Sequence, residues 1–209
     1  MSRPTARRIA LLEPLTVFTL IMAYIWQLRY SHRGLWLPIL AGVILSHVAR
    51  REDADTLGFH RRNLRECLRE FTPVLAFVGL TMVAAGMLLG TTRALSVHDA
   101  LYSWVGYLPW GTFQQYLLNG YFLNRLTGAM PGRTAAAASA VLFSGAHLPN
   151  WFLMIVTLLT GYVCARIYLR YKNLYFLGMA HATIGFLLLL VVPDSVTHHL
   201  TVGPGWFAH

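Results

Sequence analysis

The chain has 209 residues, of which 56% are hydrophobic and only 12% are charged, and its mean hydropathy is +0.51. These values exclude an ordinary soluble domain. The net charge of +9 would suit a nucleic-acid-binding protein. However, the basic residues lie between apolar stretches and do not form one basic patch, so no nucleic-acid partner is predicted.

Seven apolar stretches predict an all-α bundle of about seven membrane spans, since a span needs roughly 20 apolar residues. In chain order they cover residues 9–28, 35–49, 71–92, 104–126, 134–148, 150–169 and 174–192. The second and fifth are short. Nothing remains for a soluble domain, so residues 1–209 are predicted to be a single integral membrane domain. The first stretch is too long for a cleaved signal peptide and is expected to stay.

The basic residues predict that the amino terminus lies in the cytoplasm. With that orientation, 14 of the 17 lysines and arginines fall in segments on the inner side of the membrane. Such an excess is the positive-inside bias of membrane proteins. The segments are residues 1–8, 50–70, 125–133 and 166–172. We therefore expect a multi-pass protein, in a bacterial inner membrane.

The segment before the third stretch predicts an amphipathic helix. Residues 57–71 place Leu57, Leu64, Leu68 and Phe71 at helical spacing, with arginines between them. This pattern favours a helix on the inner membrane surface whose arginines face anionic headgroups. The alternative is a solvated linker helix that leads into the third stretch.

Five polar side chains lie inside the later apolar stretches. Gln114, Gln115 and Asn119 are in the fourth stretch, His147 ends the fifth and His181 is in the seventh. Polar groups at such depth are costly and usually face a cavity or one another. Gln115 and Asn119 share one helix face, while Gln114 points about 100° away. All five fall at similar depth, which predicts one binding or reaction cavity. Alternatively, each is a hydrogen-bonding partner between packed helices.

The chemistry of this polar centre depends on its two imidazoles. His147 and His181 could share a divalent metal such as zinc, or act as base and hydrogen-bond donor. A catalytic zinc ion normally has three protein ligands, and here the third would be an amide, a poor ligand for zinc. After Asp99 the only acidic residue is Asp194, beyond the last stretch, so no carboxylate is expected in the centre. Cys164 has no histidine near it in the sequence to act as its base.

Three motifs resemble those of the CPBP family, named for CAAX proteases and bacteriocin-processing enzymes. It includes type II CAAX prenyl endopeptidases and Abi-type bacterial membrane proteins. The family pattern is Glu-Glu-x-x-x-Arg, then Phe-x-x-x-His, then His-x-x-x-Asn or a small residue. Here Phe143 to His147 matches the second motif, and His181 to Gly185 is similar to the third. Leu57-Gly58-Phe59 looks like the family's cytoplasmic lead-in, so the resemblance covers residues 57–185.

The resemblance implies an intramembrane endopeptidase, or intramembrane metalloprotease, that acts on a membrane-embedded or lipidated peptide. In the family a first-motif glutamate activates water, the second-motif histidine orients water or binds metal, and the third motif stabilises the oxyanion. Their positions here are Gln114, Gln115, Asn119, His147 and His181. Glutamine can position a water but cannot accept its proton, and losing a general base typically costs about 10²–10⁴-fold in rate.

Two other functions remain open on the sequence alone. A catalytically inactive relative would bind a membrane peptide or partner in the same cavity, in an immunity, chaperone or regulatory role. A small-solute transporter also suits seven spans, but it is disfavoured because the spans carrying the polar centre lack a carboxylate and show no inverted repeat.

Overall fold

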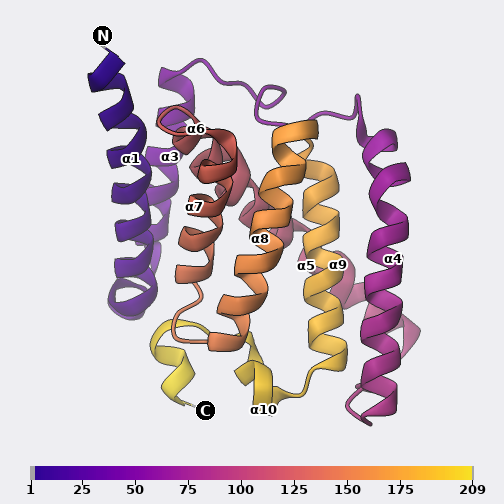
Figure 1. The fold of residues 1–209 in the computed structure, drawn as a ribbon. Helices are drawn as coiled ribbons and strands as arrows, with labels where there is room; N and C mark the ends of the chain where they lie inside the picture. Colours follow the sequence, from indigo (N-terminus) through magenta and orange to yellow (C-terminus); the bar gives the residue numbers. More distant parts are fainter. Residues whose placement is uncertain (1–2, 209) are drawn as a thin grey trace.

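A computed structural model describes residues 3–208 as a helical bundle, without a β-strand in that range (Figure 1). Helices cover all seven apolar stretches, which confirms the all-α prediction. In order, the elements are α1 (Arg3–Ala23), η1 (Tyr24–Leu28), α2 (Arg29–Ser31), η2 (Arg33–Leu35), α3 (Trp36–Ala49), α4 (Leu64–Leu88), α5 (Val97–Gln115), η3 (Tyr116–Leu123), α6 (Asn124–Thr127), α7 (Gly132–Gly145), α8 (Trp151–Tyr171), α9 (Leu174–Val191), α10 (Asp194–Thr197), η4 (His198–Leu200) and η5 (Gly203–Ala208).

Four helices are long and apolar enough to cross a membrane, and they identify an integral membrane protein. They cover Pro4–Ser31, Leu64–Leu88, Trp151–Tyr171 and Leu174–Val191. A shorter apolar helix covers Arg33–Ala49. The count of seven spans and the cytoplasmic amino terminus stay predictions. The two ends of the described chain lie at opposite ends of the bundle (Figure 1).

The segment before α4 is not the predicted surface helix. Gly58 has a φ of +98°, and a Cβ there would lie 2.5 Å from the carbonyl oxygen of Lys172. The chain therefore makes a close-packed turn that favours glycine. Leu57 is buried, and its carbonyl oxygen accepts a hydrogen bond of 2.9 Å from the Tyr168 hydroxyl. This part of the segment thus packs against the bundle and not on lipid, and α4 begins only at Leu64.

Helices α5 and α9 pack closely because glycines line their contact. A Cβ on Gly178 of α9 would lie 2.2 Å from Oγ1 of Thr112, and one on Gly185 would lie 2.5 Å from the ring of Tyr107. On the α5 side, a Cβ on Gly111 would be 3.1 Å from the α9 backbone. Small residues allow backbones to approach in this way in membrane helices. The close approach determines how the polar residues of α5 meet α9.

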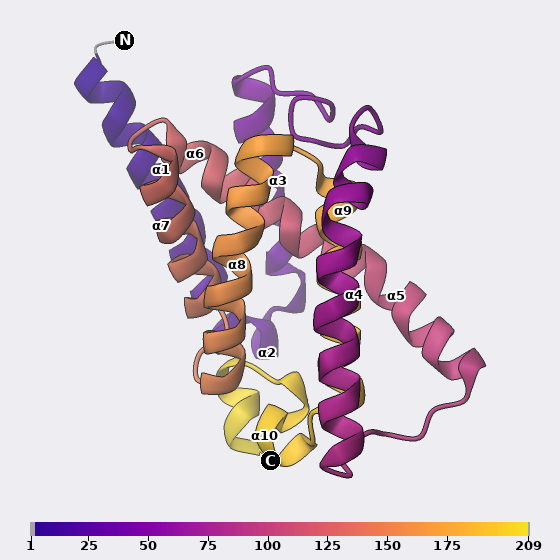
Figure 2. The ribbon, with the colours of Figure 1, turned by 45° about the vertical axis from the view of Figure 1, so that its right-hand side comes forward.

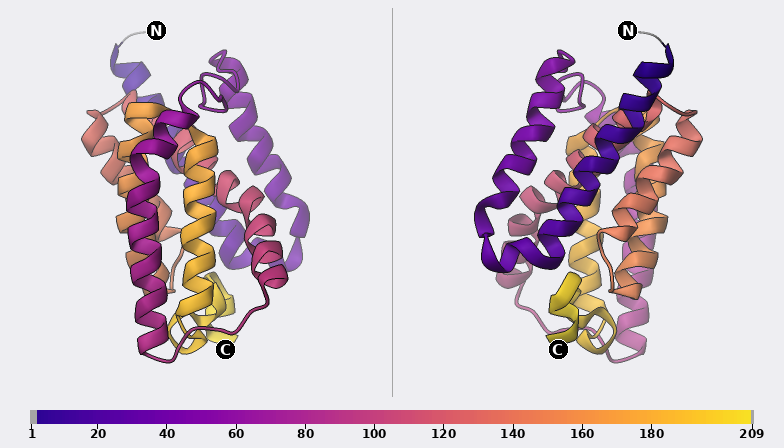
Figure 3. Two further views of the ribbon diagram at one scale, coloured as in Figure 1. Left: turned by 90° about the vertical axis from the view of Figure 1, so that its right-hand side faces the viewer. Right: turned by 90° about the vertical axis from the view of Figure 1, so that its left-hand side faces the viewer.

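Helix α5 leans away from the bundle at its first residues and reaches it only where it crosses α9 (Figures 2 and 3). Tyr102, in its outer half, is 77% exposed. Gln115, at its inner end, is almost completely buried. The helix begins with a cap in which Oγ of Ser96 accepts a 3.1 Å hydrogen bond from the backbone N–H of Asp99. The polar residues at the inner end of α5 therefore lie in the centre of the bundle, while its outer half lies at the periphery.

The carboxyl-terminal segment closes one end of the bundle (Figure 1). The buried Asn150 caps α8, because its side-chain oxygen accepts a hydrogen bond from the Leu153 N–H at 3.1 Å. Its side-chain nitrogen donates to the carbonyl oxygens of Thr197 at 2.8 Å and Thr201 at 3.1 Å. One asparagine thus joins the start of α8 to the carboxyl-terminal segment.

Candidate active site

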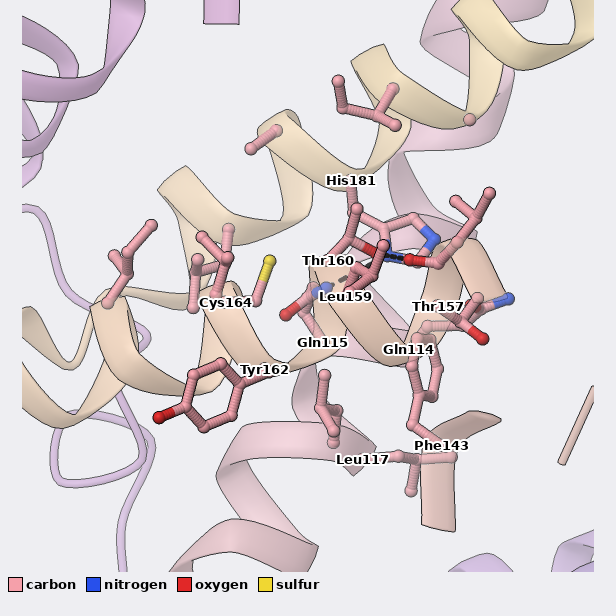
Figure 4. A pocket seen from close by; sticks show the side chains of 18 of the residues that line it. Gln114, Gln115, Leu117, Phe143, Thr157, Leu159, Thr160, Tyr162, Cys164 and His181 are labelled. Carbon is pink, nitrogen blue, oxygen red and sulfur yellow. Dashed lines mark hydrogen bonds between the residues drawn. The ribbon is translucent and has the colours of Figure 1, made fainter. Parts of the chain in front are cut away.

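A cavity of about 960 Å³ lies among α4, α5, α7, α8 and α9. Most of its lining is apolar, and four of the predicted site residues contribute to it: Gln114, Gln115, His147 and His181. Figure 4 shows part of this lining, with Gln115 opposite His181 and with Thr160, Tyr162 and Cys164 of α8 nearby. The structure therefore brings residues from three predicted spans to one cavity.

The cavity opens sideways between α4 and α8. Val74 and Val78 of α4 line it and are 57% and 37% exposed, and Leu159 and Val163 of α8 line it and are 64% and 55% exposed. These residues belong to two apolar helices of spanning length. The exposed part of the lining between them is therefore apolar.

Gln115 connects two other site residues. Its Nε2 lies 3.0 Å from Nδ1 of His181, and its Oε1 accepts a 2.7 Å hydrogen bond from Nδ2 of Asn119. Asn119 is fully buried and does not line the cavity. Its own Oδ1 has no hydrogen-bond partner among the described residues. Asn119 therefore lies behind the site, where it orients Gln115, and Gln115 in turn orients His181.

A π-helical turn follows Gln115 directly. Element η3 covers Tyr116–Leu123 and widens the helix at the residues that follow the polar pair. The carbonyl oxygen of Leu118 accepts a 2.8 Å hydrogen bond from the Ser139 hydroxyl of α7. Insertions of this kind are frequent at functional sites. Hydrophobic periodicity does not predict the π turn, since the same residues would be apolar and buried in an α-helix.

The hydrogen bond of His147 fixes the position of its ring proton. Nδ1 of His147 lies 2.7 Å from the carbonyl oxygen of Phe143. A carbonyl oxygen can only accept, so Nδ1 carries the proton and Nε2 keeps its lone pair. The Phe143 ring packs edge-on against His147, with centroids 4.9 Å apart. The Phe-x-x-x-His spacing thus supplies both the carbonyl and the ring that hold this imidazole.

His181 has the opposite arrangement. Nε2 of Gln115 donates to Nδ1 of His181, because Oε1 of the same amide already accepts from Asn119. The proton of a neutral His181 is therefore on Nε2, which makes this atom a hydrogen-bond donor at the cavity. Together the two histidines provide one acceptor, at His147, and one donor, at His181.

The remaining polar lining residues are less constrained. Gln114 lines the cavity, and within the described part of the chain its side chain makes no hydrogen bond. The Cys164 thiol forms a hydrogen bond with the side chain of Gln115. Glu70 is the one carboxylate in the lining, and it binds Nη1 of Arg170 at 2.9 Å, at the end of α8. The centre itself is built from amides and imidazoles.

The donor set does not fit a catalytic zinc ion. Within residues 3–208 no group of three or more histidine, cysteine, aspartate or glutamate side chains could hold a metal. At the predicted site only the Nε2 atoms of His147 and His181 remain, and the next available donors are amides. The site thus lacks the third strong ligand that catalytic zinc requires. The metal ligation by these two histidines therefore stays a prediction.

A buried ionic cluster that the sequence did not predict lies outside the cavity. Arg125, which is only 3% exposed, pairs with Glu52 at 2.6 Å and with Glu13 at 3.1 Å, and it contacts Nδ1 of His47 at 2.9 Å. The cluster ties α1 and α3 to α6. Arg125 therefore stabilises the fold, and it is also one of the basic residues that predict the orientation of the chain in the membrane. The signal available in the sequence was Glu13, an acid inside an apolar stretch, which requires a partner.

The protonation of Glu52 follows from this cluster. Burial of its carboxyl group raises the pKa, but hydrogen bonds from Arg125 and His47 outweigh burial and leave the pKa below its usual value. Glu52 is therefore ionised at neutral pH and balances the buried guanidinium. Because none of the cluster lines the main cavity, it supports the fold and adds no carboxylate to the polar centre.

A family of known proteins matches part of the chain. Residues 97–187 match the model of the family described as type II CAAX prenyl endopeptidase Rce1-like. Neither the curated proteins nor the solved structures gave a significant match. The matched segment begins at α5, ends in α9 and contains all five predicted site residues. Over residues 97–187, this integral membrane protein is therefore similar to the type II CAAX prenyl endopeptidase Rce1-like family.

Proposed function

We propose that this protein is an intramembrane endopeptidase that cleaves a lipidated or membrane-embedded peptide, with His147 as the general base. The observation that carries the proposal is the pair of imidazoles at one cavity, one with a free acceptor and one with a free donor. Hydrolysis of a peptide bond needs both groups, because a proton must leave water while negative charge develops on the carbonyl oxygen.

The reaction proceeds through attack of water on the scissile carbonyl carbon. Nε2 of His147 removes a proton from the water as the new C–O bond forms, and the carbonyl oxygen becomes negatively charged. Nε2–H of His181 donates a hydrogen bond to that oxygen. When the C–N bond breaks, the proton on His147 passes to the departing amine, which restores the neutral imidazole.

Glutamine at position 115 has a defined part in this mechanism. A carboxylate there would accept a hydrogen bond from Nδ1–H of His181 and leave Nε2 as an acceptor. The amide instead donates to Nδ1 and makes Nε2 the donor. The exchange of acid for amide therefore assigns His181 to oxyanion stabilisation and leaves the base function to His147.

The form of the cavity supports a lipid-modified substrate. Its volume of about 960 Å³ is at the upper end for small-molecule sites, and its walls are mostly apolar. The opening between α4 and α8 admits an apolar group from the membrane, while the polar centre is positioned to contact the attached peptide. The family description names prenyl endopeptidases, so a prenylated peptide is the first substrate class to test.

Cleavage of an internally quenched farnesylated peptide by the detergent-purified full-length protein tests the proposal. We expect turnover in the wild type and a loss of about 10²–10⁴-fold in kcat for His147→Ala, as for removal of a general base. His98→Ala is the matched control, because His98 is exposed on α5 outside the cavity. Equal turnover by wild type and His147→Ala would refute the assigned base.

The second candidate is a non-catalytic relative that binds a membrane peptide or partner in the same cavity. The absence of a carboxylate from the described polar centre favours it. Wild-type protein would then bind the farnesylated peptide without cleaving it, and Gln115→Glu would gain hydrolysis. Turnover by the wild type that disappears in His147→Ala would exclude this function.

A further inference from the structure

Tyr107 occupies the space next to the last residue of the third motif. A Cβ on Gly185 would lie 2.5 Å from Cε1 of Tyr107 and 3.3 Å from its hydroxyl oxygen. Both residues line the cavity. Gly185 stands where the family pattern places asparagine or a small residue. The Tyr107 side chain therefore fills the volume that an asparagine side chain at position 185 would need.

Tyr107 also belongs to the helix face that holds His181. Tyr107, Gly111 and Gln115 follow one another at intervals of four residues, which places them on one side of α5. Gln115 bonds Nδ1 of His181, and a Cβ on Gly111 would lie 3.2 Å from Cδ2 of that ring. The Tyr107 ring lies 6.2 Å from the imidazole, centroid to centroid. Three successive turns of α5 thus surround this histidine.

The hydroxyl group of Tyr107 has no hydrogen-bond partner among the described residues. The three buried tyrosines differ in this respect: Tyr121 bonds Glu13, Tyr168 bonds the Leu57 carbonyl and Tyr171 bonds Glu70. The Tyr107 hydroxyl is not one of the buried polar atoms that lack a partner, so it is accessible in the cavity that Tyr107 lines. A ligand in the cavity can therefore accept a hydrogen bond from it.

We propose that Tyr107 is a further catalytic residue of this site. Resting on the peptidase function proposed above, its O–H donates a hydrogen bond to the carbonyl oxygen of the scissile bond, beside Nε2–H of His181. The donor comes from α5, across the glycine at position 185 that makes room for it. Two donors then share the charge that develops in the transition state.

Tyr107→Phe tests the hydroxyl and preserves the ring that packs on Gly185. With the farnesylated quenched peptide and full-length protein, we expect kcat to fall about 10²-fold, as for removal of one oxyanion donor, with KM and the melting temperature little changed. Tyr102→Phe, an exposed tyrosine on the same helix, should retain wild-type kcat. Wild-type kcat in Tyr107→Phe would overturn the proposal and leave Tyr107 a packing residue.

Paired substitutions at positions 107 and 185 distinguish the hydrogen bond of the Tyr107 hydroxyl from the volume that its side chain fills. In Tyr107→Ala, the added substitution Gly185→Asn restores a donor in the vacated space, whereas Gly185→Leu restores only volume. We expect the asparagine double variant to regain kcat over Tyr107→Ala and the leucine double variant to remain low. Equal recovery in both double variants would contradict a role for the hydroxyl.

A wild type without turnover would refute the peptidase function, and the role of Tyr107 would then be decided by binding. We expect Tyr107→Phe to weaken binding of the farnesylated peptide about tenfold, the usual scale of one lost hydrogen bond. Unchanged affinity would overturn the hydrogen bond to the ligand carbonyl. A wild type that binds no farnesylated peptide would overturn both proposals.

Discussion

At the scale of single residues, the proton positions of the two histidines follow from what each Nδ1 atom contacts. A backbone carbonyl forces the proton of His147 onto Nδ1, and an amide N–H forces that of His181 onto Nε2. Neither assignment depends on a charged group. The amide of Gln115 is itself held by Asn119, so a residue outside the cavity determines which atom His181 offers to a ligand.

Gln115→Glu should reverse the tautomer of His181. A carboxylate has no proton to donate to Nδ1, so Nδ1 of a neutral His181 must become the donor and Nε2 the acceptor. Nitrogen NMR of protein labelled with 15N-histidine measures this directly, because protonated and unprotonated ring nitrogens have well-separated shifts. We expect the His147 signals to stay as in the wild type, since its partner is a backbone carbonyl. An unchanged His181 spectrum would refute the proposed hydrogen-bond direction.

At the scale of elements, the site depends on how closely α5 approaches α9. Gly178 meets the side chain and backbone of Thr112, and Gly185 meets Tyr107. The hydrogen bond of 3.0 Å between Gln115 and His181 crosses the same contact. A change in the distance between the two helices should therefore also change the geometry of the polar centre.

Gly178→Ala should force the two helices apart. Its Cβ would lie 2.2 Å from Oγ1 and 2.9 Å from Cα of Thr112, so a backbone has to move. We expect a loss of about 1–3 kcal/mol in stability, the usual cost of overpacking, together with reduced activity. Thermal unfolding and the peptide assay measure both.

Gly106→Ala is the matched control for that substitution. Gly106 lies in α5 with no atom within 4 Å of an added Cβ. Alanine there should stabilise the helix by up to about 1 kcal/mol through its higher helix propensity. Similar destabilisation by Gly178→Ala and Gly106→Ala would contradict the close-packing argument.

At the scale of the whole molecule, hydropathy predicted the helices well because each lies in an apolar stretch that is continuous in sequence. The grouping of Gln115, Asn119 and His181 was also predictable, since polar residues at similar depth in a membrane bundle tend to meet. Tyr107 could not be identified, because its relation to Gly185 depends on the crossing of two helices and aromatic residues are common in apolar stretches.

Contacts between distant segments account for the other differences. The turn at Gly58 exists because the chain packs there against Lys172. The glutamates that pair with Arg125 lie 73 and 112 residues away from it in the sequence. A pattern of leucines and arginines at helical spacing says nothing about either contact. The predicted surface helix was wrong in its first half for this reason.

Occupation of the cavity by a lipid-modified peptide should protect Cys164 from alkylation. Cys164 lines the cavity, whereas the other cysteine, Cys67, is buried elsewhere. In a Cys67→Ala background, a lipophilic maleimide should label Cys164 slowly, because a thiol in apolar surroundings reacts slowly. The farnesylated peptide should slow that labelling further, while the same peptide without its lipid should not. Mass spectrometry of the intact protein measures both rates. Equal labelling with and without the farnesylated peptide would show that this ligand binds elsewhere.

The carboxyl-terminal segment has a consequence for the energetics of the membrane itself. Its apolar residues Leu200 and Val202 line the cavity, and Asn150 anchors the segment to the start of α8. A hydrated chamber inside a bilayer is a potential conduit for protons, which would dissipate the electrochemical gradient of a living cell. If the proposed peptidase admits water to this cavity, the apolar side chains of Leu200 and Val202 would limit the passage of protons at that end.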